Sequence, residues 1–470
     1  MSRRSPETLP ETLSVAQVGR AGLCIGCGAC AAQSPAGGAA MRIDAFGELR
    51  PRGDPSWLNA ASPTLARTCP FSPAARHEGE LAAELFPDAP AHDPHIGRYG
   101  GAWVGYAAEG DFRADGSSGG MVTWTAAELM RRGLVDGVAH VAPSDPEGGE
   151  PLFRYRISRS PAELSAGAKS RYYPIELSQV MGEMRANPGR YALVGIPCFI
   201  KAAQLLRRED PVIGERLAFT LGLFCGHMKS ARMVESFAWQ MGARGDEVGA
   251  IDFRRKDASR PANWYQAELR LLSGEARRRD WWHMVDGDWG AGFFQSNACN
   301  FCDDVAAETA DVAFGDAWLE PYSSDGRGTN VVVARHPVVR DLIEAAIAEG
   351  RLALSPVDAE FVRRTQAAGF RQRREGLALR LAARRGLRPR KRRWPVQLAP
   401  DARRRLVYAL RAHITRWSRR MFFAARLTRL PALYLVWARA ELALYQGVTY
   451  SRGRIGQLVD RLDGWRSRRS

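Results

Sequence analysis

The sequence lacks the long apolar runs that membrane-spanning helices require. A helix that crosses a bilayer needs ~20 consecutive apolar residues, and here the apolar run at residues 430–438 ends at an arginine on each side. The first 17 residues also lack the apolar core that a secretory signal carries. We therefore expect a cytoplasmic protein, and one without disulfide bonds because those need an oxidising compartment.

Acidic residues are scarce at the C-terminal end. Residues 371–470 contain 27 Lys and Arg but 5 Asp and Glu, whereas residues 1–370 contain 40 basic and 46 acidic residues. The formal net charge of +16 therefore comes from the C-terminal part of the chain. Basic charge alone does not define a nucleic-acid-binding fold, so we expect no specific nucleic-acid partner.

Cysteine is also rare, with eight among 470 residues, but the eight divide into two sets. The N-terminal tetrad is Cys24, Cys27, Cys30 and Cys69, and the inner tetrad is Cys198, Cys225, Cys299 and Cys302. One [4Fe–4S] cluster needs four thiolates. Two tetrads therefore predict two clusters and one-electron transfer.

The N-terminal tetrad has the spacing of a bacterial ferredoxin. Cys24, Cys27 and Cys30 form C-x2-C-x2-C, and Cys69 precedes a proline, like the remote cysteine that completes such a cluster. Ser34 stands where a two-cluster ferredoxin has the ligand of its other cluster, and the second trio is missing too. Zinc sites prefer paired C-x2-C or C-x2-H spacings, so we favour one [4Fe–4S] cluster here.

The inner tetrad is less distinctive by spacing. Cys198 and Cys225 each follow an apolar run, and the ends of strands are where open α/β sheets place their sites. Cys299 and Cys302 form a C-x2-C that suits zinc as well, and Cys198 and Cys225 are equally compatible with inert core positions. Spacing alone leaves a shared cluster and these alternatives open.

Six short motifs surround these cysteines. They are GSSGGMVT at residues 116–123, GAKSRYYP at 167–174, GIPC at 195–198, LFCGH at 223–227, CNFCDD at 299–304 and ADVAFGD at 310–316. In this order, together with CIGCGAC at residues 24–30, they resemble the coenzyme F420 hydrogenase/dehydrogenase beta-subunit family over about residues 20–340.

The resemblance implies an oxidoreductase that carries FAD and two [4Fe–4S] clusters. The inner tetrad would hold the cluster beside FAD, and the N-terminal tetrad would hold the second cluster. Electrons from a ferredoxin or another redox donor protein would pass through both clusters to FAD. A small-molecule hydride acceptor such as coenzyme F420 would receive them.

The resemblance also assigns residues to the flavin. The glycine-rich loop at residues 116–120 precedes an expected helix at residues 121–130, and a helix N-terminus suits a phosphate. Lys169, with Arg171 nearby, supplies charge that can stabilise a reduced flavin. The expected flavin contacts are Gly116, Ser117, Ser118, Gly119, Gly120, Thr123, Lys169, Gly195, Pro197 and His227.

Each of these features also has a purely structural interpretation. The loop is compatible with a plain turn or cap, the segment around Lys169 with a solvated basic turn, and His227 with a structural histidine. Asp316 and Asn330 lie in similar motifs, and the sequence assigns them no role.

Together these features predict an α+β protein in three parts. Residues 1–85 form a ferredoxin-like [4Fe–4S] domain, residues 86–365 a mixed α/β core that binds flavin, and residues 366–470 a basic helical tail. Residues 86–101 are rich in Pro and Gly and are expected to form a linker. Core strands are expected at residues 135–141, 191–196, 217–224, 312–314 and 329–334.

The tail contains a candidate amphipathic helix. Apolar residues recur there at spacings of three to four, namely Val407, Leu410, Ile414, Trp417, Met421 and Ala424. With arginines on the other side, the pattern is typical of a helix lying in an anionic membrane surface. Packing against the core or a partner protein is the alternative. We expect the tail to be removable without loss of cofactors, since every cysteine precedes residue 303.

The predicted function is that of an iron–sulfur flavoprotein oxidoreductase, peripheral at the inner face of the cell membrane if the tail binds lipid. Similar basic tails occur in family members linked with polysaccharide biosynthesis. Two alternatives stay open. One is a tetrapyrrole reductase of the chlorophyll pathway, whose cysteine run resembles CSxCGLCDTYY rather than the CIGCGACAAQS found here. The other is an electron-transfer subunit at the membrane without a substrate of its own.

Overall fold

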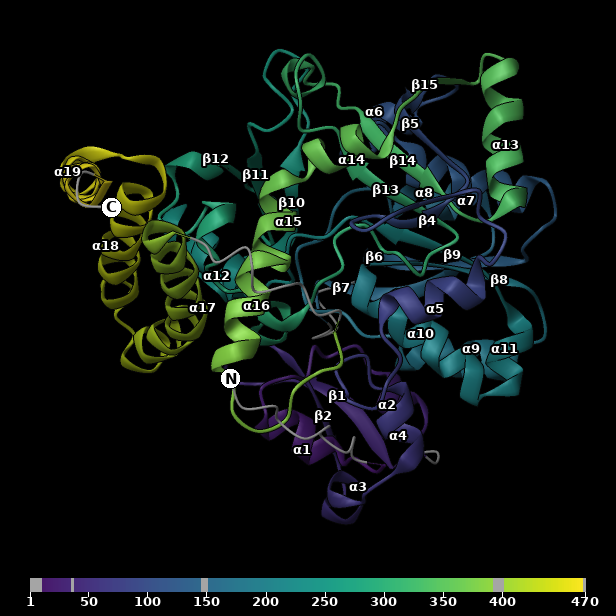
Figure 1. The fold of residues 1–470 in the computed structure, drawn as a ribbon, viewed down its shortest axis with the longest axis horizontal. Helices are drawn as coiled ribbons and strands as arrows, with labels where there is room; N and C mark the ends of the chain where they lie inside the picture. Colours follow the sequence, from purple (N-terminus) through teal and green to yellow (C-terminus); the bar gives the residue numbers. More distant parts are fainter. Residues whose placement is uncertain (1–10, 35–37, 145–150, 392–400, 468–470) are drawn as a thin grey trace.

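The computed structural model describes residues 11–34, 38–144, 151–391 and 401–467, so the first ten residues of the N-terminal segment considered above lie outside it. Its centre is an eight-stranded sheet of order β15-β5-β14-β13-β9-β8-β6-β7 (Figure 1). The strands are β5 (Gly101–Ala107), β6 (Gly137–Pro143), β7 (Phe153–Ser158), β8 (Tyr191–Gly195), β9 (Leu217–Leu223), β13 (Val312–Asp316), β14 (Asn330–Ala334) and β15 (Leu352–Pro356).

The middle of this sheet is parallel and its flanks are antiparallel. Strands β6, β8, β9 and β13 run parallel, whereas β14, β5 and β15 on one side and β7 on the other pair antiparallel. Every residue of β8 is buried, as expected for a parallel strand that is covered on both faces. The five strands predicted from apolar runs are all present in this mixed α/β sheet.

Helices cover both faces of the sheet. The helices α7 (Met121–Arg131) and α13 (Pro337–Ala348) bury apolar residues in one core, and α10 (Pro197–Glu209) buries its own in another. Helices α9 (Ser178–Ala186) and α11 (Pro211–Arg216) lie beside α10 (Figure 1). The helix expected at residues 121–130 is thus confirmed as α7. The shorter helices of the core are α6 (Phe112–Asp115), α8 (Pro161–Ala166) and α12 (Arg232–Gln240).

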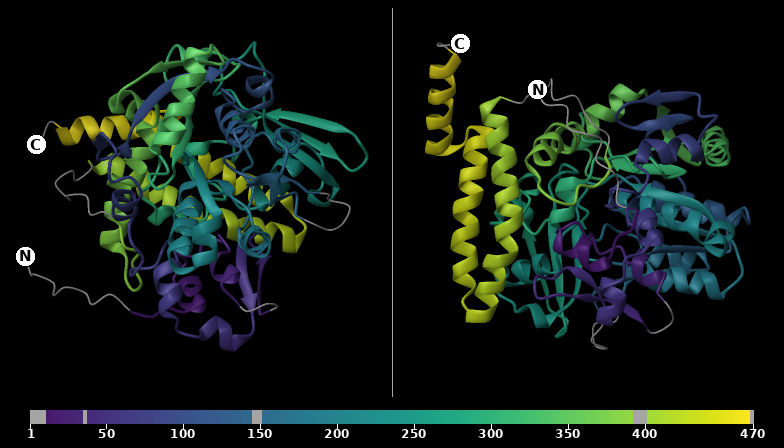
Figure 2. Two further views of the ribbon diagram at one scale, coloured as in Figure 1. Left: turned by 90° about the vertical axis from the view of Figure 1, so that its right-hand side faces the viewer. Right: turned by 60° about the horizontal axis from the view of Figure 1, so that its bottom comes forward.

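The N-terminal part packs against the α9–α10 side of the core. It contains α1 (Val15–Arg20), α2 (Ala29–Ala32), the hairpin β1 (Ala39–Ile43) with β2 (Leu49–Gly53), α3 (Pro55–Asn59), α4 (Pro63–Thr68) and α5 (Glu78–Leu85). Helix α2 contacts α9, and α4 contacts α10 (Figures 1 and 2). This packing brings the N-terminal cysteines next to the helix that carries Cys198.

The prediction of a flexible linker at residues 86–101 is wrong. Strands β3 (Ala91–Asp93) and β4 (Gly97–Tyr99) form a hairpin there, and Ile96 is fully buried between them. The Asp93 carboxylate accepts hydrogen bonds from the backbone amides of His95 and Ile96. Pro and Gly in this segment therefore shape a packed turn rather than a flexible connection.

A second sheet and the C-terminal helices complete the molecule. The sheet consists of β10 (Val248–Arg255), β11 (Gln266–Leu271) and β12 (Ala276–Asp280). The helices are α14 (Ala359–Thr365), α15 (Ala367–Arg373), α16 (Glu375–Ala383), α17 (Ala402–Thr428), α18 (Pro431–Tyr450) and α19 (Gly453–Ser467). Helices α17 and α18 form an antiparallel pair, and α19 projects beyond them (Figures 1 and 2).

The tail is packed on the core rather than appended to it. The Ser418 hydroxyl of α17 accepts a hydrogen bond from the amide of Phe294 at 3.0 Å, and the Tyr434 hydroxyl of α18 donates to Asp286 at 3.0 Å. The ring of Phe422 stacks on Trp239 with centroids 4.3 Å apart. Removal of the tail would therefore expose these core residues and destabilise the fold, while the retention of cofactors without the tail stays a prediction.

The apolar face predicted for the tail is also displaced. The buried residues of α17 are Tyr408, Ile414, Thr415, Ser418, Phe422 and Ala425, so of the predicted face only Ile414 is buried, and Trp417 is exposed. Large apolar side chains remain on the outer face, among them Leu427, Leu430 and Val436. In the described ranges no helix is long and apolar enough to cross a membrane.

Candidate functional site

A cavity of about 830 Å³ lies at the carboxyl ends of the parallel strands. It is lined by residues 194–196 at the end of β8, 223–229 at and beyond the end of β9, and 314–316 at the end of β13. Open α/β sheets bind their ligands outside the carboxyl ends of their strands. The cavity is therefore the first candidate for the flavin.

The structure brings most of the predicted flavin residues to this cavity. Those that line it are Gly116, Ser117, Ser118, Gly120, Thr123, Lys169, Gly195 and His227. Gly119 and Pro197 do not line it. The Gly119 carbonyl accepts a hydrogen bond from the amide of Ala107, and Pro197 is the first residue of α10, so both have structural roles.

Asn330, whose role the sequence left open, holds the glycine-rich loop in place. Its side-chain oxygen accepts a hydrogen bond from the amide of Met121 at 3.1 Å, and its amide nitrogen donates to the Gly315 carbonyl at 3.0 Å. Gly120 has a φ of +81°, a conformation that glycine adopts without strain. Asn330 thus caps the first turn of α7 from the adjacent strand β14.

Lys169 has an unusual backbone conformation beside the cavity. Its φ is +107°, which a non-glycine residue rarely adopts and which proteins retain mostly at functional sites. Its Nζ lies 3.6 Å from the Asp252 carboxylate. The neighbouring Arg171 is half-buried, and burial lowers the pKa of its guanidinium. The surrounding fold therefore fixes Lys169 against the cavity.

An aromatic wall bounds the cavity on the side of the smaller sheet. Arg254 pairs with Asp316 at 2.9 Å, and its guanidinium lies 4.4 Å from the Tyr265 ring centroid. The His227 ring stacks on Trp289 with centroids 4.2 Å apart. Burial lowers the pKa of His227, so that its ring is neutral at pH 7. Asp316 thus anchors Arg254, a residue that no motif in the sequence indicated.

The four cysteines of the inner tetrad lie close together beside the cavity. Cys225 follows β9 and lines the cavity, while Cys198 lies in the first turn of α10. Burial raises the pKa of Cys198, and the charges of Cys302, Cys299 and Cys225 raise it further. Burial raises the pKa of Cys299 to about 11, and its Sγ accepts a hydrogen bond from the Met228 amide at 3.3 Å.

Arg373 supplies a cation to the inner tetrad. Its Nη2 lies 3.9 Å from the Sγ of Cys225, and the charges of all four cysteines raise its pKa against the effect of burial. Its Nε and Nη1 are buried and have no hydrogen-bond partner among the described residues. Donors left over beside four thiols fit a cluster, whose sulfur atoms accept such bonds and whose net charge is negative. The sequence analysis assigned Arg373 to the tail and missed it.

The N-terminal tetrad is also assembled. Burial raises the pKa of Cys30, and the charges of Cys24, Cys27 and Cys69 raise it further. Gly26 has a φ of +78°, and a Cβ there would approach the Leu49 carbonyl oxygen to 2.7 Å. The loop between the first cysteines therefore needs glycine in order to turn tightly against β2, as a cluster-binding loop does.

The donor sets fit two [4Fe–4S] clusters. All eight cysteines are free thiols, and the members of each tetrad perturb one another's pKa. Across the described residues, no group of three or more His, Cys, Asp or Glu side chains converges tightly enough for a single metal ion. A four-iron cluster places its thiolates further apart, because each thiolate binds a different iron.

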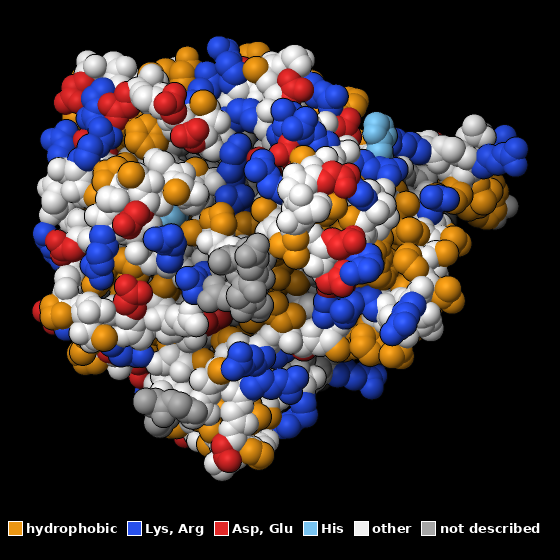
Figure 3. Space-filling model, turned by 180° about the vertical axis from the view of Figure 1, so that it is seen from behind, with side chains coloured by type: hydrophobic (Ala, Val, Ile, Leu, Met, Phe, Trp, Pro, Cys, Tyr) orange, Lys and Arg blue, Asp and Glu red, His pale blue; other side chains and the backbone are white. Residues whose placement is uncertain are grey.

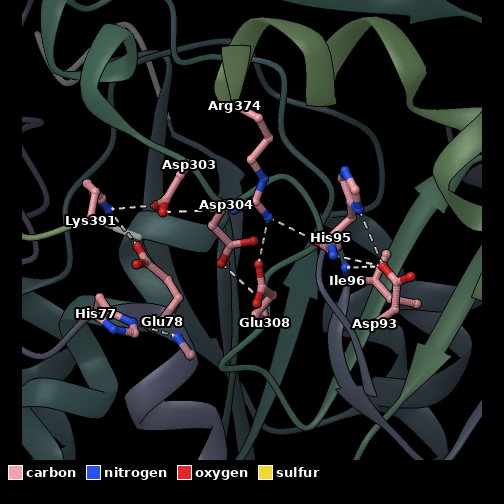
Figure 4. Close-up of polar contacts among 12 residues, drawn as sticks. His77, Glu78, Asp93, His95, Ile96, Asp303, Asp304, Glu308, Arg374 and Lys391 are labelled. Atoms are coloured by element: carbon pink, nitrogen blue, oxygen red, sulfur yellow. Dashed lines mark hydrogen bonds and ion pairs between the residues drawn. The ribbon is translucent and has the colours of Figure 1, made fainter. Parts of the chain in front are cut away.

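A buried charge network includes Asp303, the residue that follows Cys302 (Figure 4). Glu78 of α5 pairs with Lys391 at 2.7 Å and with Lys201 at 3.3 Å, and Lys391 also reaches Asp303 at 3.2 Å. Burial and Asp303 raise the pKa of Glu78, but the two lysines outweigh both and hold it below its usual value. Lys201 in turn lowers the pKa of Cys69. The network thus joins the N-terminal part, the core and the tail.

Comparison with known proteins places these features in a family. The model for the N-terminal part of the coenzyme F420 hydrogenase/dehydrogenase beta subunit matches residues 102–181, and the model for its C terminus matches residues 189–360. These regions contain the cavity's glycine-rich loop and the inner tetrad. Oxidoreductase subunits are thus the class that this chain resembles, and the chain belongs to the coenzyme F420 hydrogenase/dehydrogenase beta-subunit family.

The individual relatives share little sequence identity with this chain. One of the subunits of the F(420)H(2) dehydrogenase of Methanosarcina mazei is 24% identical over 219 residues, which are 45% of this chain and 55% of that protein. The chain thus spans about half the length of this curated relative. A chain from the F420-reducing [NiFe] hydrogenase complex of Methanosarcina barkeri aligns at 16% identity and a TM-score of 0.49, over 64% of this chain and 98% of that one.

Proposed function

We propose that this protein is an iron–sulfur flavoprotein oxidoreductase with FAD in the cavity and a [4Fe–4S] cluster in each tetrad. The observation that carries the proposal is the position of Cys225. It belongs to the inner tetrad and lines the same cavity as the glycine-rich loop and Lys169. A cluster held there would adjoin a flavin in the cavity.

The arrangement of the two tetrads supports the proposed route of electrons from the N-terminal cluster to the inner one. The charge of Cys27 raises the pKa of Cys198, so the two tetrads are near neighbours. Helix α2, which contains Cys30, lies in the N-terminal part at the bottom of Figure 1, away from α7. When bound, the clusters supply one-electron transfer and the flavin links it to hydride transfer. The donor is proposed to be a ferredoxin or a similar redox protein, and the acceptor coenzyme F420 or another small molecule.

The side chains around the cavity bind and orient rather than react. Lys169 and the amides of the glycine-rich loop provide positive charge for a phosphate or a reduced ring. His227 Nε2 is buried without a hydrogen-bond partner among the described residues, so a bound flavin would satisfy it. The packed aromatic residues exclude water from the same space.

The test is anaerobic purification followed by a screen of electron acceptors. The protein should bind flavin, and a reduced ferredoxin should bleach the flavin absorbance until an acceptor such as coenzyme F420 restores it. A chain that binds flavin and clusters but passes electrons to no small molecule would be a relay subunit. A chain that binds no flavin would refute the proposal.

We also propose that the outer face of the tail attaches to an anionic membrane surface. Leu427 is 75% exposed, Val436 65% and Leu430 59%, and Arg429 and Arg439 are exposed beside them. Figure 3 shows further hydrophobic and basic side chains on the projecting end, which is α19. Exposed apolar side chains among arginines fit a surface that is apolar within and negative at its headgroups.

Vesicle flotation tests this attachment. The full chain should bind anionic vesicles at low salt, release them at high salt, and ignore neutral ones. Replacing both Leu427 and Val436 by Asp should abolish binding, whereas Leu272→Asp, at an exposed leucine in the turn after β11, should not. Equal binding by all three proteins would show that this face does not contact the membrane.

A further inference from the structure

Arg411 of α17 lies in the wall of the cavity, beyond residue 360 where the family match ends. Its Nε is buried and has no hydrogen-bond partner among the described residues. Within those residues no carboxylate lies close enough to form an ion pair with it. Tyr450, at the end of α18, lines the cavity too. Helices α17 and α18 therefore contribute a cation, without an ion-pair partner among the described residues, to a cavity that the family core and residues 364–373 also line.

Several cationic or neutral groups lie close to Arg411. Its charge lowers the pKa of His227, Lys229 and Arg380 in addition to the effect of burial. Lys229 is buried, lines the cavity and donates a hydrogen bond to the Phe293 carbonyl at 2.6 Å. Its Nζ lies 4.8 Å from the Trp289 ring centroid. Asp286 and Asp288 raise the pKa of Lys229, but burial and Arg411 outweigh them and lower it to about 7. An anion bound beside Lys229 and Arg411 would therefore stabilise both charges.

The two carboxylates that act on Lys229, Asp286 and Asp288, accept hydrogen bonds from other donors. Asp286 accepts hydrogen bonds from Ser236, Gln240 and Tyr434. Asp288 accepts from the amide of Ala291 at 3.2 Å and from Gln446 at 3.1 Å. Neither forms an ion pair with Arg411, so none of the carboxylates in the described part of the chain pairs with it.

The inner tetrad does not require this cation either. Arg373 lies beside those thiols, and all four of them raise its pKa. Arg411 is not among the principal causes of the pKa shifts of Cys198, Cys225 and Cys299. The two arginines are therefore assigned to different anions.

We infer that Arg411, together with Lys229, forms a subsite for an oxyanion, a carboxylate or a phosphate, of the substrate that enters the cavity. Trp289 and Tyr450 bound the same region and provide flat surfaces for the body of that molecule. The inference rests on the proposed function, since it assumes that flavin occupies the part of the cavity lined by the glycine-rich loop. It makes the C-terminal helices a determinant of substrate specificity.

The experiment uses the full-length, flavin-loaded protein and calorimetric titration with inorganic phosphate and, separately, with succinate. One of the two should bind to the wild type, and the preferred probe identifies the class of oxyanion. Arg411→Gln should weaken that binding at least tenfold, and Arg411→Lys should recover part of it. Arg416→Gln, at an exposed arginine on the same helix, is the matched control and should bind like the wild type.

Two further readouts separate this role from others. The flavin dissociation constant should be the same in Arg411→Gln as in the wild type, and the melting temperature should stay equal or rise because a repulsion is removed. A parallel loss of flavin affinity would assign Arg411 to the flavin phosphates and overturn the inference. Unchanged probe binding, or no probe binding to the wild type, would overturn it as well. Failure of the proposed function itself would differ, since no flavin would bind.

Discussion

Arg373 and Cys225 lie 3.9 Å apart, from Nη2 to Sγ, although 148 residues separate them in the sequence. This contact joins a helix outside the family match to a cysteine inside it. The guanidinium is buried, so its charge acts on the thiols with little screening by solvent. The C-terminal segment therefore contributes a cation to the inner tetrad.

Arg373→Leu should make the reduction potential of the inner cluster more negative. Reduction adds negative charge to the cluster, and the nearby cation stabilises that charge. The expected shift is on the order of 60 mV, which corresponds to about 1.4 kcal/mol for one electron. A redox titration followed by electron paramagnetic resonance measures it. Arg371→Leu, at an exposed arginine of the same helix, is the control, and equal shifts in both variants would contradict the assignment.

Single serine substitutions should separate the two tetrads. Cys27→Ser should remove the N-terminal cluster and leave flavin bound. Cys299→Ser should damage the inner cluster and slow flavin reduction by a ferredoxin more than reduction by dithionite, because a small reductant can reach the cavity directly. Stopped-flow absorbance measures both rates. Equal slowing by the two reductants would show that the inner tetrad is not on the electron route.

Lys391→Met should lower the free energy of unfolding by about 3–5 kcal/mol. Lys391 is buried and pairs with Glu78 and Asp303, so its loss leaves two buried carboxylates with Lys201 as the nearby lysine. Denaturant titration of the anaerobic protein measures the change. Arg385→Met, at an exposed arginine six residues earlier, should change stability little. A small effect of Lys391→Met would mean that the network is hydrated.

His140 should make the protein less stable in mild acid. Burial and the charge of Arg156 lower its pKa from 6.5 to about 4, so the folded protein favours the neutral ring. The stability from this residue is complete above pH 6.5 and is lost as the pH falls towards 4, by about 3 kcal/mol. His140→Gln should lose less stability over that window. Unfolding free energies between pH 4 and 7 test this, and identical pH profiles would refute it.

The sequence predicted the parts of the site whose chemistry is local. Cysteine spacing separated the two tetrads, and the apolar runs before Cys198 and Cys225 predicted strands β8 and β9, which the structure contains. The motifs predicted that Lys169 and the glycine-rich loop belong to the same site, and both line one cavity. These features depend on residues that are close in sequence or on periodicity that a short segment carries.

The parts of the site that the sequence did not predict depend on contacts between segments that are distant in the sequence. Arg373, Lys391 and Arg411 read as ordinary members of a basic tail, because nothing in the sequence shows which arginines are buried. The apolar periodicity of α17 was visible, but its buried side follows Phe422 and Ser418 rather than Trp417 and Met421. The Pro and Gly content of residues 86–101 predicted a linker, but hydrogen bonds to Asp93 and the burial of Ile96 hold this segment in a packed hairpin.

The most direct test of the account is the cofactor content of the anaerobically prepared protein. Two cubanes and one flavin predict about eight irons, about eight acid-labile sulfides and one FAD per chain. Cys27→Ser and Cys299→Ser should each retain about half of the iron, and the doubly substituted protein should retain none. A wild-type protein with about four irons, or one in which Cys27→Ser keeps the full iron content, would contradict the assignment of a cluster to each tetrad.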